Sequence, residues 1–199
     1  MNCTGLINAG IGSDCKLPTK GYEREGVIIN RADIDFGSLA DPVNNTYATM
    51  PLKSGKTGFK IIQLGDQPFE GTKSSLRKGT YGNGFDHVLQ FVVLDNTPAV
   101  SHDIIDALAS GEFVVILECK DKGGSSKNGA FKVYGIEVGL KAETMENDAY
   151  SEAAGGWIVT LKEEANSSAC YLFATSYAAT KTLVEGLLPS SASLSSDTQ

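Results

Sequence analysis

The order of apolar and polar positions along the chain predicts strands over most of its length. Short runs rich in β-branched and aromatic residues, bounded by glycine, proline or asparagine, are typical of strands. The predicted strands are 22–29 (YEREGVII), 31–36 (RADIDF), a short piece within 46–50, 59–64, 85–96, 112–120, 130–140 with a bulge at Gly135, 157–163 and 169–176. Strand 112–120 is apolar at nearly every central position, so we expect both of its faces to be buried.

One segment has helical periodicity instead. Thr97 is suited to cap a helix, Pro98 to occupy its first position and Gly111 to end it. The apolar side chains that share one stripe are Val100, Ile104, Ile105 and Leu108. We therefore expect one amphipathic helix at about 97–110 that covers a sheet.

The remaining segments are rich in glycine, proline, asparagine or serine. They are predicted as an extended N-terminal arm (1–20), a long loop (37–58), a long loop or protruding hairpin (65–84), an acidic stretch without a strong pattern (142–156) and a Ser-rich, disordered C-terminal tail (186–199). Residues 21–185 then form a single domain. Its hairpin-like connections favour a mainly β fold, an antiparallel β-sandwich or barrel with one flanking helix and long loops or arms.

The stretch PLKSGKTGFKII at 51–62 resembles the end of a phosphate-binding P-loop. A P-loop needs a glycine five positions before its Gly-Lys-Thr and a helix after it, so that backbone N–H groups point at the phosphates. Met50 occupies the glycine position, Pro51 has no N–H to offer, and the following residues predict a strand. We expect a basic turn that binds no nucleotide.

The amino-acid composition argues against several further classes of protein. The 199 residues carry a formal net charge of −7, whereas proteins that grip nucleic acid need a surplus of Lys and Arg on one face. This balance still allows DNA to slide past the protein. No apolar run reaches the roughly 18 residues of a membrane span, and the first residues lack a secretory signal. We expect a protein made in the cytoplasm, with no membrane partner.

Catalytic and metal-binding patterns are not found. Cys3, Cys15, Cys119 and Cys170 have no metal-ligand spacing, so we expect free thiols, with the last two as small core residues and a pairing of the first two left open. His87 and His102 each stand beside an aspartate and lack a nucleophile motif. The carboxylate pairs are Asp33/Asp35, Glu143/Glu146 and Glu163/Glu164, and they come without an aromatic-lined cleft. We expect no enzyme, catalytic residue, cofactor or metal.

The second half of the chain resembles the tail tube proteins of long-tailed bacteriophages, particularly those of Bacteroides-group hosts. The likeness lies in the order FVVLDNTP, helix, GEFVVILECK, turn, AFKVYGIEVGLK, acidic segment, AGGWIVTLKEEA, and covers about residues 85–166. Its most specific part is FKVYGIEVGL followed by GGWIVTL.

This resemblance implies a virion structural protein whose copies form stacked rings, a tube through which DNA passes without specific binding. The partners are then other copies of the chain and other tail proteins, and the location is the phage tail. It also implies that the 112–138 hairpin lies in a lumen-facing or inter-subunit sheet. The expected inter-subunit contacts in segment 65–84 are Lys73, Arg77, Lys78 and Tyr81.

Other interpretations remain open. Segment 65–84 is equally compatible with a mobile, solvated loop. A carbohydrate- or protein-binding sandwich of a fibre would share the composition, but would be a monomer or trimer with exposed aromatic side chains on its loops. A tail terminator or connector would share the ring without forming long tubes. The host and the number of subunits per ring are not fixed by the sequence.

Overall fold

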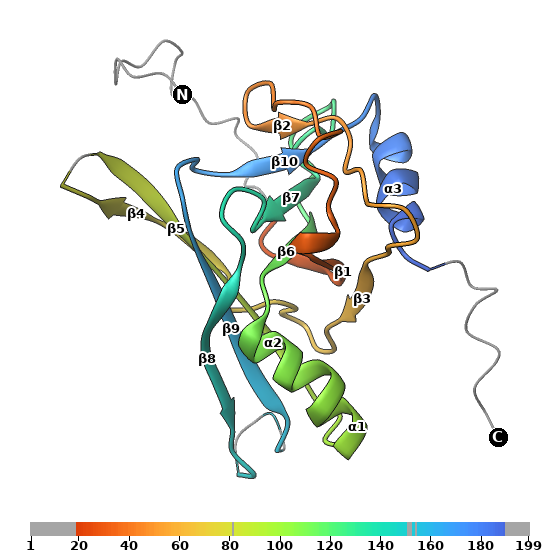
Figure 1. The fold of residues 1–199 in the computed structure, drawn as a ribbon. Helices are drawn as coiled ribbons and strands as arrows, with labels where there is room; N and C mark the ends of the chain where they lie inside the picture. The colour runs from red at the N-terminus through yellow and green to blue at the C-terminus, as the bar shows by residue number, and fades with distance from the viewer. Residues whose placement is uncertain (1–18, 81, 151–152, 154, 190–199) are drawn as a thin grey trace.

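The computed structural model describes residues 19–80, 82–150, 153 and 155–189, and it shows a mainly β protein with flanking helices (Figure 1). The strands are β1 (Tyr22–Asn30), β2 (Thr46–Tyr47), β3 (Phe59–Ile62), β4 (Lys73–Lys78), β5 (Asn83–Val93), β6 (Phe113–Cys119), β7 (Phe131–Tyr134), β8 (Lys141–Asn147), β9 (Trp157–Ala165) and β10 (Cys170–Leu172). The helical segments are η1 (Arg31–Asp33), α1 (Pro98–Val100), η2 (Ser101–Ile105), α2 (Asp106–Ser110) and α3 (Tyr177–Gly186). The expected β-sandwich with a flanking helix is confirmed.

Six strands form the first sheet, in the order β2-β10-β7-β6-β1-β3. All neighbours are antiparallel except β10 and β2, which run parallel. Strand β6 lies inside this sheet, and Val114 to Leu117 are almost completely buried. The prediction that this strand is covered on both faces is therefore confirmed.

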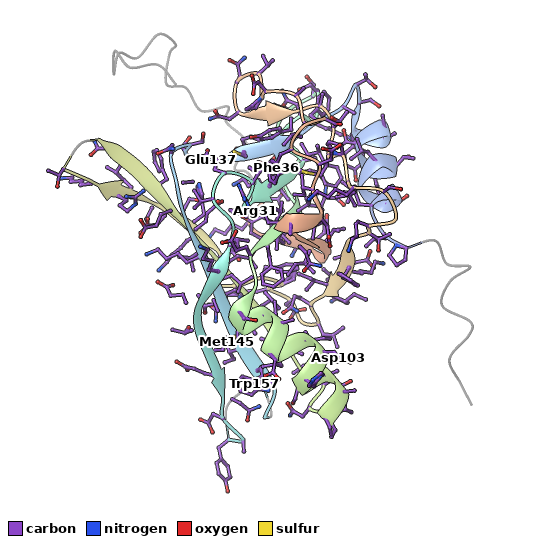
Figure 2. The ribbon with its side chains drawn as sticks, in the orientation of Figure 1. Arg31, Phe36, Asp103, Glu137, Met145 and Trp157 are labelled. Carbon is purple, nitrogen blue, oxygen red and sulfur yellow. The ribbon has the colours of Figure 1, made fainter. Side chains whose placement is uncertain are left out.

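The second sheet contains four antiparallel strands in the order β4-β5-β9-β8. Its inner face packs on the first sheet, because one core cluster takes Leu89 and Phe91 from β5, Leu161 from β9, and Val115 and Leu117 from β6. Met145 and Trp157 pack against the same cluster and lie along the β8–β9 pair (Figure 2).

A second core cluster covers the other face of the six-stranded sheet. Val27 and Ile116 of this face pack with Tyr47 and Met50 of the 37–58 segment and with Leu187 at the end of α3. The 37–58 segment is mostly irregular, as predicted, but it lies on the protein's own core. The fold thus has a helix-and-loop layer, a buried sheet and a second sheet with one outer face.

The helix predicted at 97–110 spans Pro98–Ser110, and its middle turn, Ser101–Ile105, is π-helical. The Thr97 hydroxyl accepts a hydrogen bond from the Val100 N–H at 3.4 Å, which confirms the predicted cap. Ile105 and Leu108 are buried, whereas Ile104 is 43% exposed. The predicted stripe holds for Ile105 and Leu108 but not for Ile104, because the wider π turn changes which side chains face the sheet, and Val100 is half-buried outside both core clusters.

Two predicted segments differ in the structure, and a third takes one of its two predicted forms. Residues 31–36 do not form a strand: Arg31–Asp33 make a 3-10 turn, and the Asn30 amide donates to the Asp33 carboxylate at 3.0 Å. Segment 65–84, predicted as a long loop or a protruding hairpin, takes the hairpin form at Lys73–Lys78, which pair with β5. The acidic stretch 142–156, for which no strand was predicted, contains all of β8 except its first residue, Lys141.

The C-terminal boundary also differs. Helix α3 was not predicted, and Leu187, assigned to the disordered tail, is buried against the core. The Leu187 carbonyl accepts from the Gly58 N–H at 2.7 Å, which fixes the end of the helix beside the start of β3. Residues 1–18 of the predicted arm and 190–199 of the tail lie outside the described residues.

Candidate functional site: the open four-stranded sheet

The four-stranded sheet has one face that belongs to neither core cluster. Side chains alternate along β5 and β9, so one set points to the first sheet and the other set points away from it. The half-exposed outward side chains at the centre are Val88, Gln90, Val92, Ile158, Thr160 and Lys162. This outer face therefore mixes apolar, amide, hydroxyl and charged groups.

A row of ion pairs crosses this outer face. The Arg77 guanidinium on β4 lies 3.0 Å from the Asp86 carboxylate on β5, as an ion pair without an aligned hydrogen bond, and 3.6 Å from Glu164 on β9. The Lys162 ammonium lies 3.0 Å from Asp86 and 3.7 Å from Glu143 on β8. The hydrogen bond from Lys162 to Asp86 raises the pKa of the lysine. Opposite charges thus alternate across all four strands, which favours this strand order.

Both edges of the sheet are open over most of their length. In the described part of the chain, β4 forms ladder pairs only with β5, and β8 only with β9, while the isolated Phe113–Leu140 bridge lies just before β8. An edge with unpaired N–H and C=O groups is a template for another strand. Successive strands are antiparallel, so β4 and β8 point in opposite directions.

The two edges carry different charges. Strand β4, KSSLRK, has three basic side chains and no acidic one, whereas β8, KAETMEN, has two acidic side chains and one basic one. Lys141 of β8 pairs with Glu112 at 2.9 Å, so its charge is neutralised. The remaining charged side chains of this edge, Glu143 and Glu146, are both acidic. The edges are therefore complementary in charge as well as in direction.

The structure places the predicted contact residues on or beside β4. Arg77 is held within the ion-pair row, while Lys73 shares its face and Lys78 lies on the opposite face at the hairpin end. Both lysines are exposed. Tyr81 lies outside the described residues. The β4–β5 hairpin projects beyond the body of the protein (Figure 1), so these lysines are accessible to a neighbour.

The expectation for the 112–138 hairpin is wrong. Strands β6 and β7 lie inside the six-stranded sheet, and their side chains are covered on one side by the second sheet and on the other by α3 and the 37–58 segment. The four-stranded sheet, by contrast, has one face that lies outside both core clusters.

A buried polar cluster fixes the hairpin to the rest of the sheet. His87 Nε2 lies 2.9 Å from the Ser167 carbonyl oxygen, and His87 Nδ1 lies 2.7 Å from the Ser74 hydroxyl of β4. Glu163 is the cross-strand neighbour of His87, and it accepts from the Gly135 N–H at 2.6 Å. Burial raises the pKa of Glu163. Both imidazole nitrogens have partners inside the protein, so His87 is structural.

The other residues considered for catalysis or metal binding do not form a shared site. His102 is exposed and pairs with Asp103 at 2.7 Å, which raises the pKa of the imidazole. Glu163 and Glu164 point to opposite faces of β9, so they cannot flank one bond. Among the described residues, no group of three or more His, Cys, Asp or Glu side chains could hold a metal ion.

The cysteines predicted as core residues are free thiols. Cys119 and Cys170 are buried in β6 and β10, as expected. Burial raises the pKa of both thiols, to about 12 for Cys170, which keeps them protonated and unreactive at neutral pH. Cys3 and Cys15 lie outside the described residues.

The Lys56 turn has a structural role. The Lys56 ammonium lies 3.3 Å from the Asp33 carboxylate, and Met50, which precedes the turn, is buried in the core. The turn leads into β3, as predicted, so it lacks the helix on which a P-loop depends.

No protein-family model, curated protein or solved structure matches this chain. Within the part of the chain that the structure describes, no helix combines the length and the apolar character needed to cross a bilayer.

Proposed function

We propose that the protein is a non-catalytic virion subunit whose copies form stacked rings, the tail tube of a long-tailed bacteriophage. The observation that carries this proposal is the four-stranded sheet, with an outer face outside both cores and two open edges that are opposite in direction and charge. Its partners are further copies of the chain and other tail proteins, and its location is the virion.

The strand directions support a closed ring. In a ring made by rotation, each copy keeps its orientation relative to the axis, so β8 of one copy meets β4 of the next. These strands are antiparallel, which lets the sheet continue from copy to copy with the same ladder pattern. A sheet closed in this way has no free edge left to aggregate.

The outer face suits a conduit. Arg77 and Lys162 are already paired with carboxylates, and Lys141 is paired with Glu112, so few cations on this face are free to hold phosphate. The ion-pair row holds the three carboxylates Asp86, Glu143 and Glu164 against the two cations Arg77 and Lys162, so its net charge is negative and repels phosphate. Facing the lumen, this sheet lets DNA slide past without binding it.

Charge reversal at the two edges tests the proposal. We expect negative-stain images of the purified protein to show rings and tubes, and Lys73→Glu/Lys78→Glu to abolish them. The quadruple variant that adds Glu143→Lys/Glu146→Lys restores opposite charges and should restore assembly. The control Lys20→Glu/Lys181→Glu makes the same charge change at exposed lysines away from β4 and should assemble normally. Rings that never stack would identify a terminator or connector, and a persistent monomer would exclude the ring.

One observation favours a second function. Tyr150, in the β8–β9 connection, is 98% exposed, and an exposed aromatic ring on a loop is typical of a carbohydrate- or protein-binding module. This function requires a stable monomer or trimer, so the imaging experiment separates the two.

A further inference from the structure

An apolar groove lies between the edge strand of the six-stranded sheet and the helix. It has a volume of about 360 Å³. Strand β3 forms one wall, the end of β5 another, and α2 and the η2 turn the third, all in the same region of the molecule (Figure 1). The apolar side chains that line its depth include Ile28, Phe91, Leu108 and Phe113.

Four large apolar side chains stand exposed around this groove. Phe59 is 55% exposed, Ile62 and Leu94 are each 54% exposed, and Ile104 is 43% exposed. Such side chains are normal when scattered singly, but a group of them around one groove marks an interaction surface. The π turn that directs Ile104 away from the sheet contributes one of the four.

The groove also offers a backbone edge. Strand β3 pairs with β1 on one side and is the last strand of its sheet. Beyond it, the Gln63 amide bridges to β5: its nitrogen donates to the Val92 carbonyl, and its oxygen accepts from the Val92 N–H, both at 2.9 Å. This bridge fixes the position of β5 relative to β3. An open strand edge beside apolar walls suits an extended segment with apolar side chains.

We infer that the occupant is the chain's own N-terminal segment, residues 1–18. Its branched aliphatic side chains are Leu6, Ile7, Ile11 and Leu17, and it carries no charged side chain before Asp14. The groove is correspondingly poor in charge, with Lys60 and Asp95 as its only charged lining residues. The described chain ends at Pro189, two residues after Leu187, which bonds to Gly58 beside β3, but the sequence of 190–199 has Leu194 as its only large apolar residue and matches this surface poorly.

Residues 1–18 are long enough to reach the groove from Thr19. The described chain begins at Thr19, and Glu25 of β1 is already paired with Ile62 at the groove. Six residues of extended chain span about 20 Å, and eighteen span about 60 Å. The segment can therefore fill the groove of its own copy or of a second copy, and the inference does not depend on ring formation.

The native thiols allow a direct test by cross-linking. Cys3 and Cys15 lie in the segment, while Cys119 and Cys170 are buried and do not compete. Ile62→Cys and Leu94→Cys each place a thiol at the groove with little change in volume. With a short bis-maleimide, we expect peptides joined to Cys3 or Cys15 in a yield several-fold above that of Val138→Cys, a control exposed elsewhere at 44%.

Two further arms make the result decisive. Adding Cys3→Ser/Cys15→Ser should abolish the cross-link, and a mixture of isotope-labelled and unlabelled protein shows whose groove is filled. Hydrogen exchange gives an independent measurement: the amides of 59–62 should exchange several-fold faster in a variant lacking 1–18 than in the full chain. Cross-linking no greater than at Val138→Cys, or equal exchange with and without the segment, would overturn the inference.

Discussion

His87 and Glu163 lie directly opposite each other on β5 and β9, and both side chains are buried inside the protein. The imidazole connects β4 to the chain after β9 through Ser74 and the Ser167 carbonyl. Glu163 Oε1 accepts from Gly135, but Oε2 is buried without a hydrogen-bond partner. An ionised carboxylate in this position is poorly solvated, and this determines how stability changes with pH.

The free energy of unfolding should fall as pH rises because of Glu163. Burial raises the pKa of its carboxyl above the reference value of 4.5, although the Gly135 N–H and the nearby His87 oppose the shift. The folded state therefore keeps the proton to a higher pH than the unfolded state does. The stability that the retained Glu163 proton contributes is fully present below the pKa of this carboxyl in the unfolded state. It is lost as pH rises through the pKa of the same carboxyl in the folded state.

Glu163→Gln should remove this loss, because the amide is uncharged and keeps an oxygen for the Gly135 N–H. In urea unfolding measured from pH 4 to pH 8, the stability of the variant relative to wild type should increase with pH. Glu164→Gln is the matched control, one residue along β9 with its side chain in solvent. A constant difference between Glu163→Gln and wild type over this range would show that the buried carboxyl does not titrate as described.

Removal of the Thr97 cap should destabilise the protein. The hydroxyl satisfies the Val100 N–H, which has no partner inside the helix, so Thr97→Ala should cost about 1 kcal/mol of unfolding free energy. Ser110→Ala removes a hydroxyl from the last turn of the same helix without removing an N-cap, and it should change stability by less than about 0.5 kcal/mol. Equal losses in the two variants, measured by chemical denaturation, would contradict a capping role.

Local patterns predicted the elements whose signals are complete within a few residues. The helix at 97–110 has a cap, a proline and a stripe, and β6 has a continuous apolar run; both are present. Helix α3 carried a comparable signal that was missed: the Ser176 hydroxyl accepts from the Ala179 N–H at 3.2 Å as a cap, and Tyr177, Val184 and Leu188 pack on the core at helical spacing. The strand predicted at 169–176 extended over this cap and hid the helix.

Other elements depend on contacts between distant residues. Strand β8 has a register shift between Ala142 and Thr144, so its inward positions are Ala142 and Met145, and the expected alternation is broken. Residues 31–36 alternate as a strand would, but Arg31 donates to the Glu137 carbonyl at 3.0 Å and stacks on Phe36 (Figure 2). The distant partner Glu137 and the nearby Phe36 hold Arg31 in a turn, so the segment does not extend as a strand.

The candidate site was predicted only in part. Lys73, Arg77 and Lys78 stood out as basic residues in an acidic chain, and they lie along one open edge. The opposite edge, with Glu143 and Glu146, could not be paired with them in advance, because β4 and β8 become the two edges of one sheet only after β5 and β9 pair between them. Strand order is a property of the whole chain.

Nucleotides should leave the melting temperature unchanged. The Lys56 ammonium is paired with Asp33, Pro51 offers no N–H, and the chain continues into β3, so the turn lacks a phosphate cradle. We expect ATP or GTP at millimolar concentration, with Mg²⁺, to shift the thermal transition by no more than buffer of equal ionic strength does. A rise of several degrees would indicate binding to the folded state.

Gly135→Ala should be among the most destabilising single substitutions in the protein. Gly135 has φ +86°, and a Cβ there would lie 2.1 Å from the Phe113 carbonyl oxygen and 3.0 Å from the Leu140 nitrogen. These two groups are joined by reciprocal hydrogen bonds of 2.9 Å between Phe113 and Leu140, so neither can move aside freely. Backbone strain contributes about 1–2 kcal/mol, and the clash should bring the total to about 3 kcal/mol or more.

Gly55→Ala separates the two causes. Gly55 has φ +74°, but an added Cβ would meet nothing within 4 Å, so this variant carries the backbone strain alone and should lose about 1 kcal/mol. The difference between the two variants in urea unfolding then measures the close approach of Gly135 to Phe113. The Gly135 N–H donates to Glu163 and lowers the pKa of its carboxyl, so a Gly135→Ala change that displaces this N–H should raise that pKa further and strengthen the loss of stability with rising pH. Equal losses in the two glycine variants would mean that the Phe113–Leu140 junction yields easily, contrary to its hydrogen bonding.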